Sequence, residues 1–194
     1  MVMRASRWSS RSATKLLSSK ENPEAELTAP SYRQLAADIV LPPPPALMPA
    51  NYNERLPVAD AAFKKFADEM KVWTEGVRDM ISQMETIAPL DPPEATKMLE
   101  SVRDVFRKLA IDTASQATRE QITIRAAQLA QGSENPQKAA RFIRRRFNES
   151  ADAFLEQLAK IDTRLTTLIW DTDPEARGGP SFENADDLIA YLNS

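Results

Sequence analysis

The sequence predicts an all-α fold: an antiparallel three-helix bundle or coiled coil with a disordered, proline-containing N-terminal arm and a short C-terminal helix. Two observations support this prediction. Apolar residues recur at heptad spacing, and prolines bound three long windows that contain none, between Pro57 and Pro89, Pro93 and Pro136, and Pro136 and Pro174. A seam that repeats about every 3.5 residues lies along one side of a helix and is buried against other helices. A proline inside a helix costs about 3 kcal/mol, so each window predicts a helix.

The first and third windows carry the most regular seams, and they predict helices over about 58–88 and 136–171. The seam of the first window passes through Ala59, Phe63, Phe66, Met70, Trp73, Val77, Met80, Met84 and Ile87. The seam of the third window passes through Phe147, Ala151, Phe154, Leu158, Ile161, Leu165 and Leu168. Asn135 before Pro136 has the order of an N-cap residue followed by proline at the first helical position, which supports this start.

The second window predicts a helix over about 93–131, and Asp91 can cap its start. Its seam begins with Leu99, Val102, Phe106 and Leu109. Continued at the same spacing, the seam meets only Thr113, Gln116, Glu120 and Thr123. The next apolar stripe is out of phase with the first and consists of Ile122, Ala126 and Leu129. Two alternatives follow. Either the helix breaks within 112–121, where Thr118–Gln121 matches a capping box, or it continues with a polar side facing solvent.

The connections between the windows set the directions of the helices. The segments at about 88–93 and 132–136 are short, which makes consecutive helices antiparallel neighbours in a bundle over about 58–172. The apolar seams are narrow for a self-sufficient three-helix core. A homo-oligomer formed through the remaining apolar surface is therefore a further expectation.

The segments outside the bundle differ from it in composition. Residues 1–57 form a basic and proline-rich arm, expected to be disordered apart from a short helix at about 31–40. The proline run after Leu41 is either a stiff spacer that holds the arm off the bundle or a ligand for proline-binding modules. Residues 173–194 form an acidic loop and a short helix, which is marginal alone and so docks on the bundle or on a partner. The candidate docking residues are Tyr32, Leu35, Ile39, Leu188, Ile189 and Leu192.

The composition excludes several kinds of catalytic and metal site. The 194-residue chain has no cysteine and no histidine, which removes disulfides, structural zinc, thiol nucleophiles and imidazole bases. We therefore expect a protein that is not an enzyme, with no catalytic residue, metal or cofactor. No apolar run approaches the roughly 18–20 residues that span a bilayer, so we expect a soluble, cytoplasmic protein. The serine- and arginine-rich residues 1–20 leave mitochondrial import or specialised secretion as alternatives.

One cluster of cations lies at the start of the third predicted helix and consists of Lys138, Arg141, Arg144, Arg145 and Arg146. In a helix, residues 138, 141 and 145 share one face, with 144 beside it. The cluster is a candidate contact for phosphate oxygens of nucleic acid or for an anionic surface. The alternative is a solvated face whose cations pair with Glu149, Asp152 or acids of a neighbouring helix.

The predicted function is a non-enzymatic helical interaction protein, such as a scaffold, adaptor or assembly subunit, which binds protein partners through helix faces. One alternative is an anionic-surface or nucleic-acid binding protein that uses residues 138–146 and the basic N-terminus. A secreted effector and a granule-coat protein are two further candidate functions. The granule-coat function is suggested by a general similarity to phasins, which are also cysteine-poor helical proteins.

Overall fold

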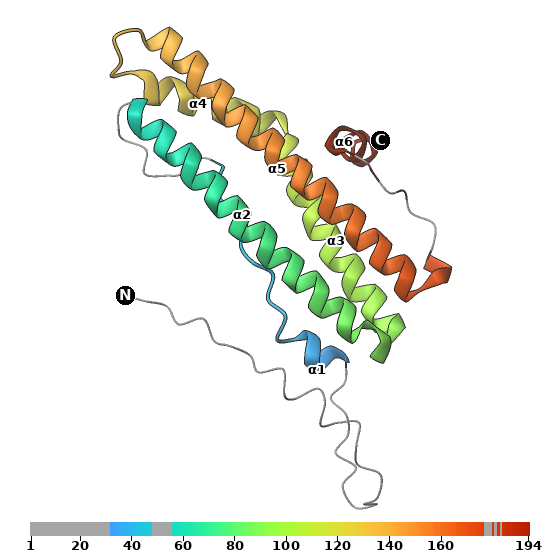
Figure 1. Ribbon diagram of the computed structural model, residues 1–194. Helices are drawn as coiled ribbons and strands as arrows, with labels where there is room; N and C mark the ends of the chain where they lie inside the picture. Colours follow the sequence, from blue (N-terminus) through green and yellow to red (C-terminus); the bar gives the residue numbers. More distant parts are fainter. Residues whose placement is uncertain (1–31, 48–55, 177–179, 181, 183) are drawn as a thin grey trace, which may run out of the picture. The chain divides into compact units, whose positions relative to one another are not determined.

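The computed structural model describes residues 32–47, 56–176, 180, 182 and 184–194, without the side chains of 56–60, 62 and 176. All regular elements in these residues are helical (Figure 1), which confirms the predicted all-α class. Most of the predicted N-terminal arm, including its basic residues 1–20, lies outside the described residues, so its expected disorder stays a prediction.

The described residues form six α-helices and two 3₁₀ turns. The long helices are α2 (Leu56–Ile87), α3 (Pro92–Ala114), α4 (Gln116–Ala130) and α5 (Pro136–Thr172). The short helices are α1 (Tyr32–Ala36) and α6 (Ala185–Leu192), and the 3₁₀ turns are η1 (Ala88–Leu90) and η2 (Pro174–Ala176). The segment expected as one helix over about 93–131 is therefore two helices, and the helix expected at about 31–40 is limited to α1.

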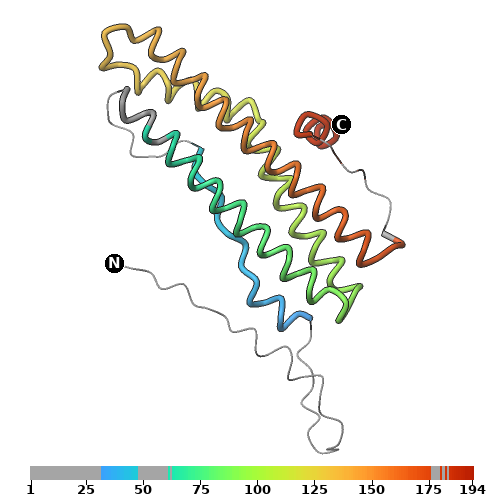
Figure 2. Tube along the Cα trace, viewed as in Figure 1, coloured from blue at the N-terminus to red at the C-terminus, as the bar shows by residue number. Residues whose placement is uncertain are grey.

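The central element is α5, which has 37 residues and packs against α2, α3 and α4. Figure 2 shows α3 and α4 following one another along α5. Both run antiparallel to α5, because Arg107 of α3 pairs with Asp162 near the end of α5, whereas Arg119 of α4 pairs with Asp152.

The remaining long helix, α2, lies beside α5 and runs in the same direction. The rings of Phe63 and Phe147 contact each other near the starts of the two helices, with centroids 5.1 Å apart. Farther along, Glu85 of α2 pairs with Arg164 of α5 at 2.6 Å. The two helices therefore form a parallel pair that is closed on one side by α3 and α4.

Two of the three clusters of buried apolar side chains in the described residues hold the long helices together. The main cluster includes Trp73, Val77, Met84, Leu99, Phe106, Phe154, Leu158, Leu165, Ile169 and Leu188. The second cluster joins the start of α2 to α4 and α5 and consists of Phe63, Ile122, Ala126, Ala130, Ala139, Ile143, Phe147 and Ala151. The predicted seams of the first and third windows are the buried sides of α2 and α5 wherever their side chains are described, except that Met70 and Ile87 are only partly buried.

The predicted N-caps of two helices are confirmed. The Asp91 side chain accepts a hydrogen bond from the backbone N–H of Glu94 at 3.3 Å, at the start of α3. The Asn135 side chain accepts one from the backbone N–H of Lys138 at 3.1 Å, at the start of α5. Each cap satisfies a backbone donor that has no partner inside its own helix.

The helices α3 and α4 are separated at Ser115, whose backbone is extended, with φ −60° and ψ 150°. The Ser115 hydroxyl accepts a hydrogen bond from the backbone N–H of Thr118 at 3.2 Å and donates one to the Asp112 carbonyl at 2.8 Å. Of the two alternatives that the sequence leaves open, the break within 112–121 is therefore the one observed. The capping box predicted for Thr118–Gln121 is wrong, because the cap residue is Ser115. The break changes the phase of the helix, and the buried side of α4 consists of Ile122, Ala126 and Ala130.

Replacing Ser115 with Ala is expected to lower the free energy of unfolding by about 1 kcal/mol, because the Thr118 N–H loses its side-chain acceptor. Ser101→Ala is the matched control, since the exposed Ser101 hydroxyl only donates to the Lys97 carbonyl within α3. The control is expected to change stability by less than about 0.5 kcal/mol. Urea unfolding followed by circular dichroism measures both values, and equal losses in the two variants would contradict the capping role of Ser115.

Residues 32–47 pack against the long helices. Tyr32 and Ala36 of α1 are buried beside the turn between α2 and α3, and burial, together with the nearby negative charge of Glu94, raises the pKa of the Tyr32 hydroxyl. The Trp73 indole N–H donates a hydrogen bond to the Pro42 carbonyl at 3.1 Å. Residues 41–44 also border α3 across a shallow hollow. The expectation of a spacer that holds the arm off the bundle is therefore wrong for this segment, which covers the seam between α2 and α3.

The C-terminal segment covers a second seam, between α3 and α5. The Thr163 hydroxyl donates a hydrogen bond to the Phe182 carbonyl at 2.6 Å, and Phe182 and Leu188 are buried in the main cluster. Asn184 caps α6 by accepting a hydrogen bond from the backbone N–H of Asp187 at 2.9 Å. Of the two predicted alternatives, docking on the bundle is the one observed, and α6 contacts both α3 and α5.

Candidate functional site: the groove between α2 and α5

The seam between α2 and α5 carries a groove of about 410 Å³. Its lining comes from these two helices and consists of Thr74, Val77, Arg78, Ile81, Ser82, Gln157, Lys160, Ile161 and Arg164. No other described segment contributes to the lining. This seam therefore differs from its two neighbours, which are covered by residues 38–47 and by α6.

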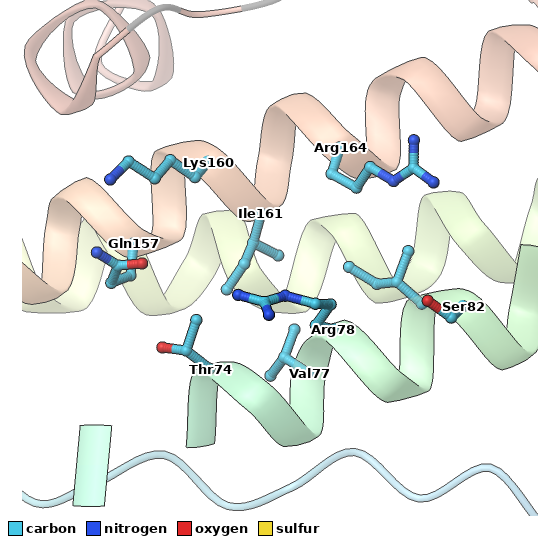
Figure 3. A pocket seen from close by; sticks show the side chains of 9 residues that line it. Thr74, Val77, Arg78, Ser82, Gln157, Lys160, Ile161 and Arg164 are labelled. Atoms are coloured by element: carbon cyan, nitrogen blue, oxygen red, sulfur yellow. The ribbon is translucent and has the colours of Figure 1, made fainter. Parts of the chain in front are cut away.

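The floor of the groove is apolar. It is formed by Val77, Ile81 and Ile161, whose side chains belong to the main core cluster and are only 1%, 4% and 7% exposed. In Figure 3 the Ile161 side chain points from α5 toward α2. Because the floor is part of the core, it is rigid and keeps the spacing between the two walls fixed.

The walls of the groove are polar and positively charged. Arg78 stands on α2, whereas Lys160 and Arg164 stand on α5, and all three are exposed. None of the nine lining residues is acidic. Figure 3 shows the Arg78 side chain extending between the two helices. The aliphatic stems of these long cations widen the apolar surface of the groove, while their charged ends remain in water.

Only one of the three wall cations is paired within the part of the chain that the structure describes. The Arg164 guanidinium donates a hydrogen bond to a Glu85 carboxylate oxygen at 2.6 Å, and both side chains are about half exposed. Arg78 and Lys160 form no ion pair with any described residue. Each wall of the groove therefore offers one cation whose charge is not balanced by a contact within the described chain.

The predicted basic cluster lies elsewhere, on the first turns of α5. Arg145 and Arg146 donate hydrogen bonds to the two carboxylate oxygens of Glu149, at 2.9 and 3.2 Å, and these hydrogen bonds lower the pKa of Glu149. The Arg146 guanidinium also lies 5.2 Å from the ring centroid of Phe63. For these two arginines the structure shows the predicted alternative of a solvated, paired face.

The other three cations of the cluster are Lys138, Arg141 and Arg144, and all are exposed. They form no ion pair with the described residues, and they do not line the groove between α2 and α5. Asp152, the other acid expected to pair with the cluster, is bound instead by Arg119 of α4 at 2.8 Å. The structure thus places the cluster on an outer helix face.

The six candidate docking residues make contacts within the chain itself. Tyr32 and Leu188 are buried, and Leu35, Ile39, Ile189 and Leu192 are partly buried. Ile39, Ile189 and Leu192 pack against the main core cluster. Their side chains therefore hold the terminal segments on the bundle, and docking of these residues to another protein stays a prediction.

Sequence reasoning missed Arg78, Lys160 and Arg164. The available signal was their position, since Arg78 follows the seam residue Val77 and Lys160 precedes the seam residue Ile161. Residues next to a seam flank the contact between two helices. The three-dimensional packing decides which seam-flanking residues of two helices lie opposite each other. It also decides whether another segment covers them.

The described helices include none with the length and apolar character that a membrane span requires. The described side chains also contain no group of three or more carboxylates placed to hold a metal ion. No family model matches the chain, and no curated protein or solved structure is detectably similar to it. Its function is therefore argued from the groove and its surroundings.

Proposed function

We propose that the chain is a non-enzymatic interaction protein, a scaffold, adaptor or assembly subunit built on an antiparallel three-helix bundle, and that it binds a partner protein in the groove between α2 and α5. The observation that carries this proposal is the unequal covering of the seams. Described terminal segments of the chain lie over the seams α2/α3 and α3/α5, and the α2/α5 seam alone has none of them in its lining.

The groove has the features of a surface that recognises a helix. Two rigid neighbouring helices provide an apolar floor with polar residues on both sides, which is the arrangement of helix-in-groove binding. Such a site needs no catalytic group, which agrees with a chain that lacks histidine and cysteine. The basic cluster on α5 is a less favourable site, because it is a convex helix face and two of its arginines already share Glu149.

The proposal is tested by blocking the groove with a bulky side chain. Ser82→Trp places an indole on the exposed wall of the groove, whereas Gln83→Trp places one on the next, exposed residue of α2, which does not line it. The tagged full chain and both variants are used to capture proteins from a lysate of the organism that makes the protein. Circular dichroism and a mass measurement in solution check the fold and the oligomeric state of each sample.

The wild type and Gln83→Trp are expected to retain a protein partner in similar amounts. The amount retained by Ser82→Trp is expected to be lower by about tenfold or more. A dimer that becomes monomeric only with Ser82→Trp would identify a second copy of the chain as the occupant. Equal capture by all three samples would contradict the groove as the binding surface. No retained protein and a monomer in every sample would contradict the interaction function itself.

A further inference from the structure

We infer that the occupant of the groove is an amphipathic helix of a partner protein, with an apolar stripe flanked by carboxylates. This inference rests on the proposed function and adds the chemistry of the partner. Its first support is charge. The groove walls carry three cations and no acid, and Arg78 and Lys160 face the groove from opposite helices without an ion pair to a described residue. A segment with acids on both sides of an apolar stripe would meet one unpaired cation on each wall.

The second support is the length of the groove. Its lining runs from Thr74 to Ser82 on α2 and from Gln157 to Arg164 on α5, which is eight and seven residue steps. At 1.5 Å per residue, these stretches are about 10–12 Å long, or about two helical turns. Two turns present an apolar stripe of two or three side chains, which matches a floor made of Val77, Ile81 and Ile161.

The third support comes from the way the chain uses its own C-terminal helix. The helix α6 is amphipathic and acidic: Leu188 is buried in the seam between α3 and α5, while Asp186 and Asp187 in its first turn are exposed. The guanidinium of Arg107 lies 5.8 Å from the ring centroid of Tyr191 on α6. The charge of Arg107 is paired with Asp162, so α6 is held by its buried apolar side rather than by its acids. One seam of these helices thus already holds a short amphipathic helix, and the α2/α5 seam adds two cations without an ion pair to a described residue.

The chain's own N-terminal residues fit the groove poorly. Residues 1–20 contain five cations and no acid, so they would be repelled by the groove walls. Their cations are Arg4, Arg7, Arg11, Lys15 and Lys20. Residues 21–30 contain three glutamates, but Leu27 is their one large apolar residue, so they lack the stripe of two or three apolar side chains that matches the floor. An acidic segment of another chain, with such a stripe, is therefore the better occupant.

The test uses three synthetic helical peptides of about 18 residues, long enough to form helix in water. All three carry the same leucine stripe, and their flanking residues are glutamate, glutamine or lysine. Fluorescence anisotropy measures the binding of each labelled peptide to the full chain. The glutamate peptide is expected to bind about tenfold or more tightly than the glutamine peptide, and the lysine peptide to bind weakest. The affinity of the glutamate peptide should fall as salt rises from about 0.05 to about 0.5 M.

Two charge-reversal variants locate the binding. The double variant Arg78→Glu with Lys160→Glu is expected to bind the glutamate peptide about tenfold or more weakly than the wild type does. The matched control is Arg141→Glu with Arg144→Glu, which makes the same charge change at exposed cations that also lack an ion pair to a described residue, and it should leave binding within about twofold. The opposite pattern would place the peptide on the basic cluster and overturn the inference.

The remaining outcomes separate the inference from the function on which it rests. If the three peptides bind equally well and Ser82→Trp blocks all of them, the inference that the partner helix is acidic is overturned. The groove would then remain the binding surface. No binding of any peptide would also overturn the inference, and the capture experiment with Ser82→Trp would then decide the proposed function by itself.

Discussion

Replacing Asp162 with Ala is expected to lower the free energy of unfolding by about 3–5 kcal/mol, because it leaves the partly buried Arg107 guanidinium without its partner. The Asp162 side chain is 1% exposed and that of Arg107 is 14% exposed. Asp162 accepts hydrogen bonds from Arg107 Nε at 2.6 Å and from Nη2 at 3.2 Å. Burial by itself would lower the pKa of Arg107. The hydrogen bond and the negative charge of Asp162 outweigh this effect of burial, so the pKa of Arg107 is raised overall. Without Asp162 the guanidinium stays charged and is stabilised less.

The double variant Arg107→Met with Asp162→Leu is the control for this prediction. It removes both charges and keeps apolar volume, so we expect a stability within about 1–2 kcal/mol of the wild type. Urea unfolding of the full chain, followed by circular dichroism, measures the three proteins. If Asp162→Ala lowers the free energy of unfolding by less than about 1 kcal/mol, the unpaired Arg107 guanidinium is not the costly buried charge that we infer. A double variant as unstable as the single one would assign the loss to packing instead.

The second large effect is expected for Trp73→Ala, which should also cost about 3–5 kcal/mol. The indole is 4% exposed, and its ring packs against Phe106 of α3 and Phe154 of α5, with centroids 6.0 and 5.1 Å away. Its N–H binds the Pro42 carbonyl. One side chain thus joins three helices and the segment that covers the seam between α2 and α3, and alanine leaves a cavity where they meet.

Trp73→Phe separates the packing of the ring from the hydrogen bond. Phenylalanine retains most of the ring contacts but cannot donate to Pro42, so a loss of about 1–2 kcal/mol is expected. Denaturant unfolding gives both stabilities. Amide hydrogen exchange of Ile39, whose N–H donates to the Ala36 carbonyl at 3.0 Å, reports on the covering segment, because residues 42–45 are prolines and have no amide N–H. Exchange there should be faster in both variants. Equal stability losses for Phe and Ala would show that ring packing is not the main contribution of Trp73.

The buried sides of α2 and α5 could be predicted because heptad spacing is a local property of the sequence. Val77 and Leu158 belong to regular seams, and both are buried. The loss of seam phase within 112–121 is also a local property, but it allowed both a break and a continuous helix with a polar side, and the structure places the break at Ser115. The sequence pattern predicts a cap at Thr118, whereas the structure has it at Ser115, because Ser and Thr both accept such hydrogen bonds and the sequence does not say which hydroxyl does.

The covering of the seams could not be predicted from spacing. The hydrogen bond from Trp73 to Pro42 joins residues 31 positions apart, and no periodicity connects a proline run to a helix seam. The groove is similar, because Arg78 and Lys160 are ordinary exposed cations until α2 and α5 are placed side by side. A candidate site made by the packing of distant helices leaves no motif in the sequence.

The proposed binding groove is tested most directly by methyl NMR of the full chain titrated with the glutamate peptide. The largest shifts are expected at the floor methyls of Val77, Ile81 and Ile161, with little change at the buried Leu188 of α6. Largest shifts at Ile122 and Ile143, which lie in the second core cluster near the basic face of α5, would contradict the groove as the binding surface. So would a spectrum that does not change.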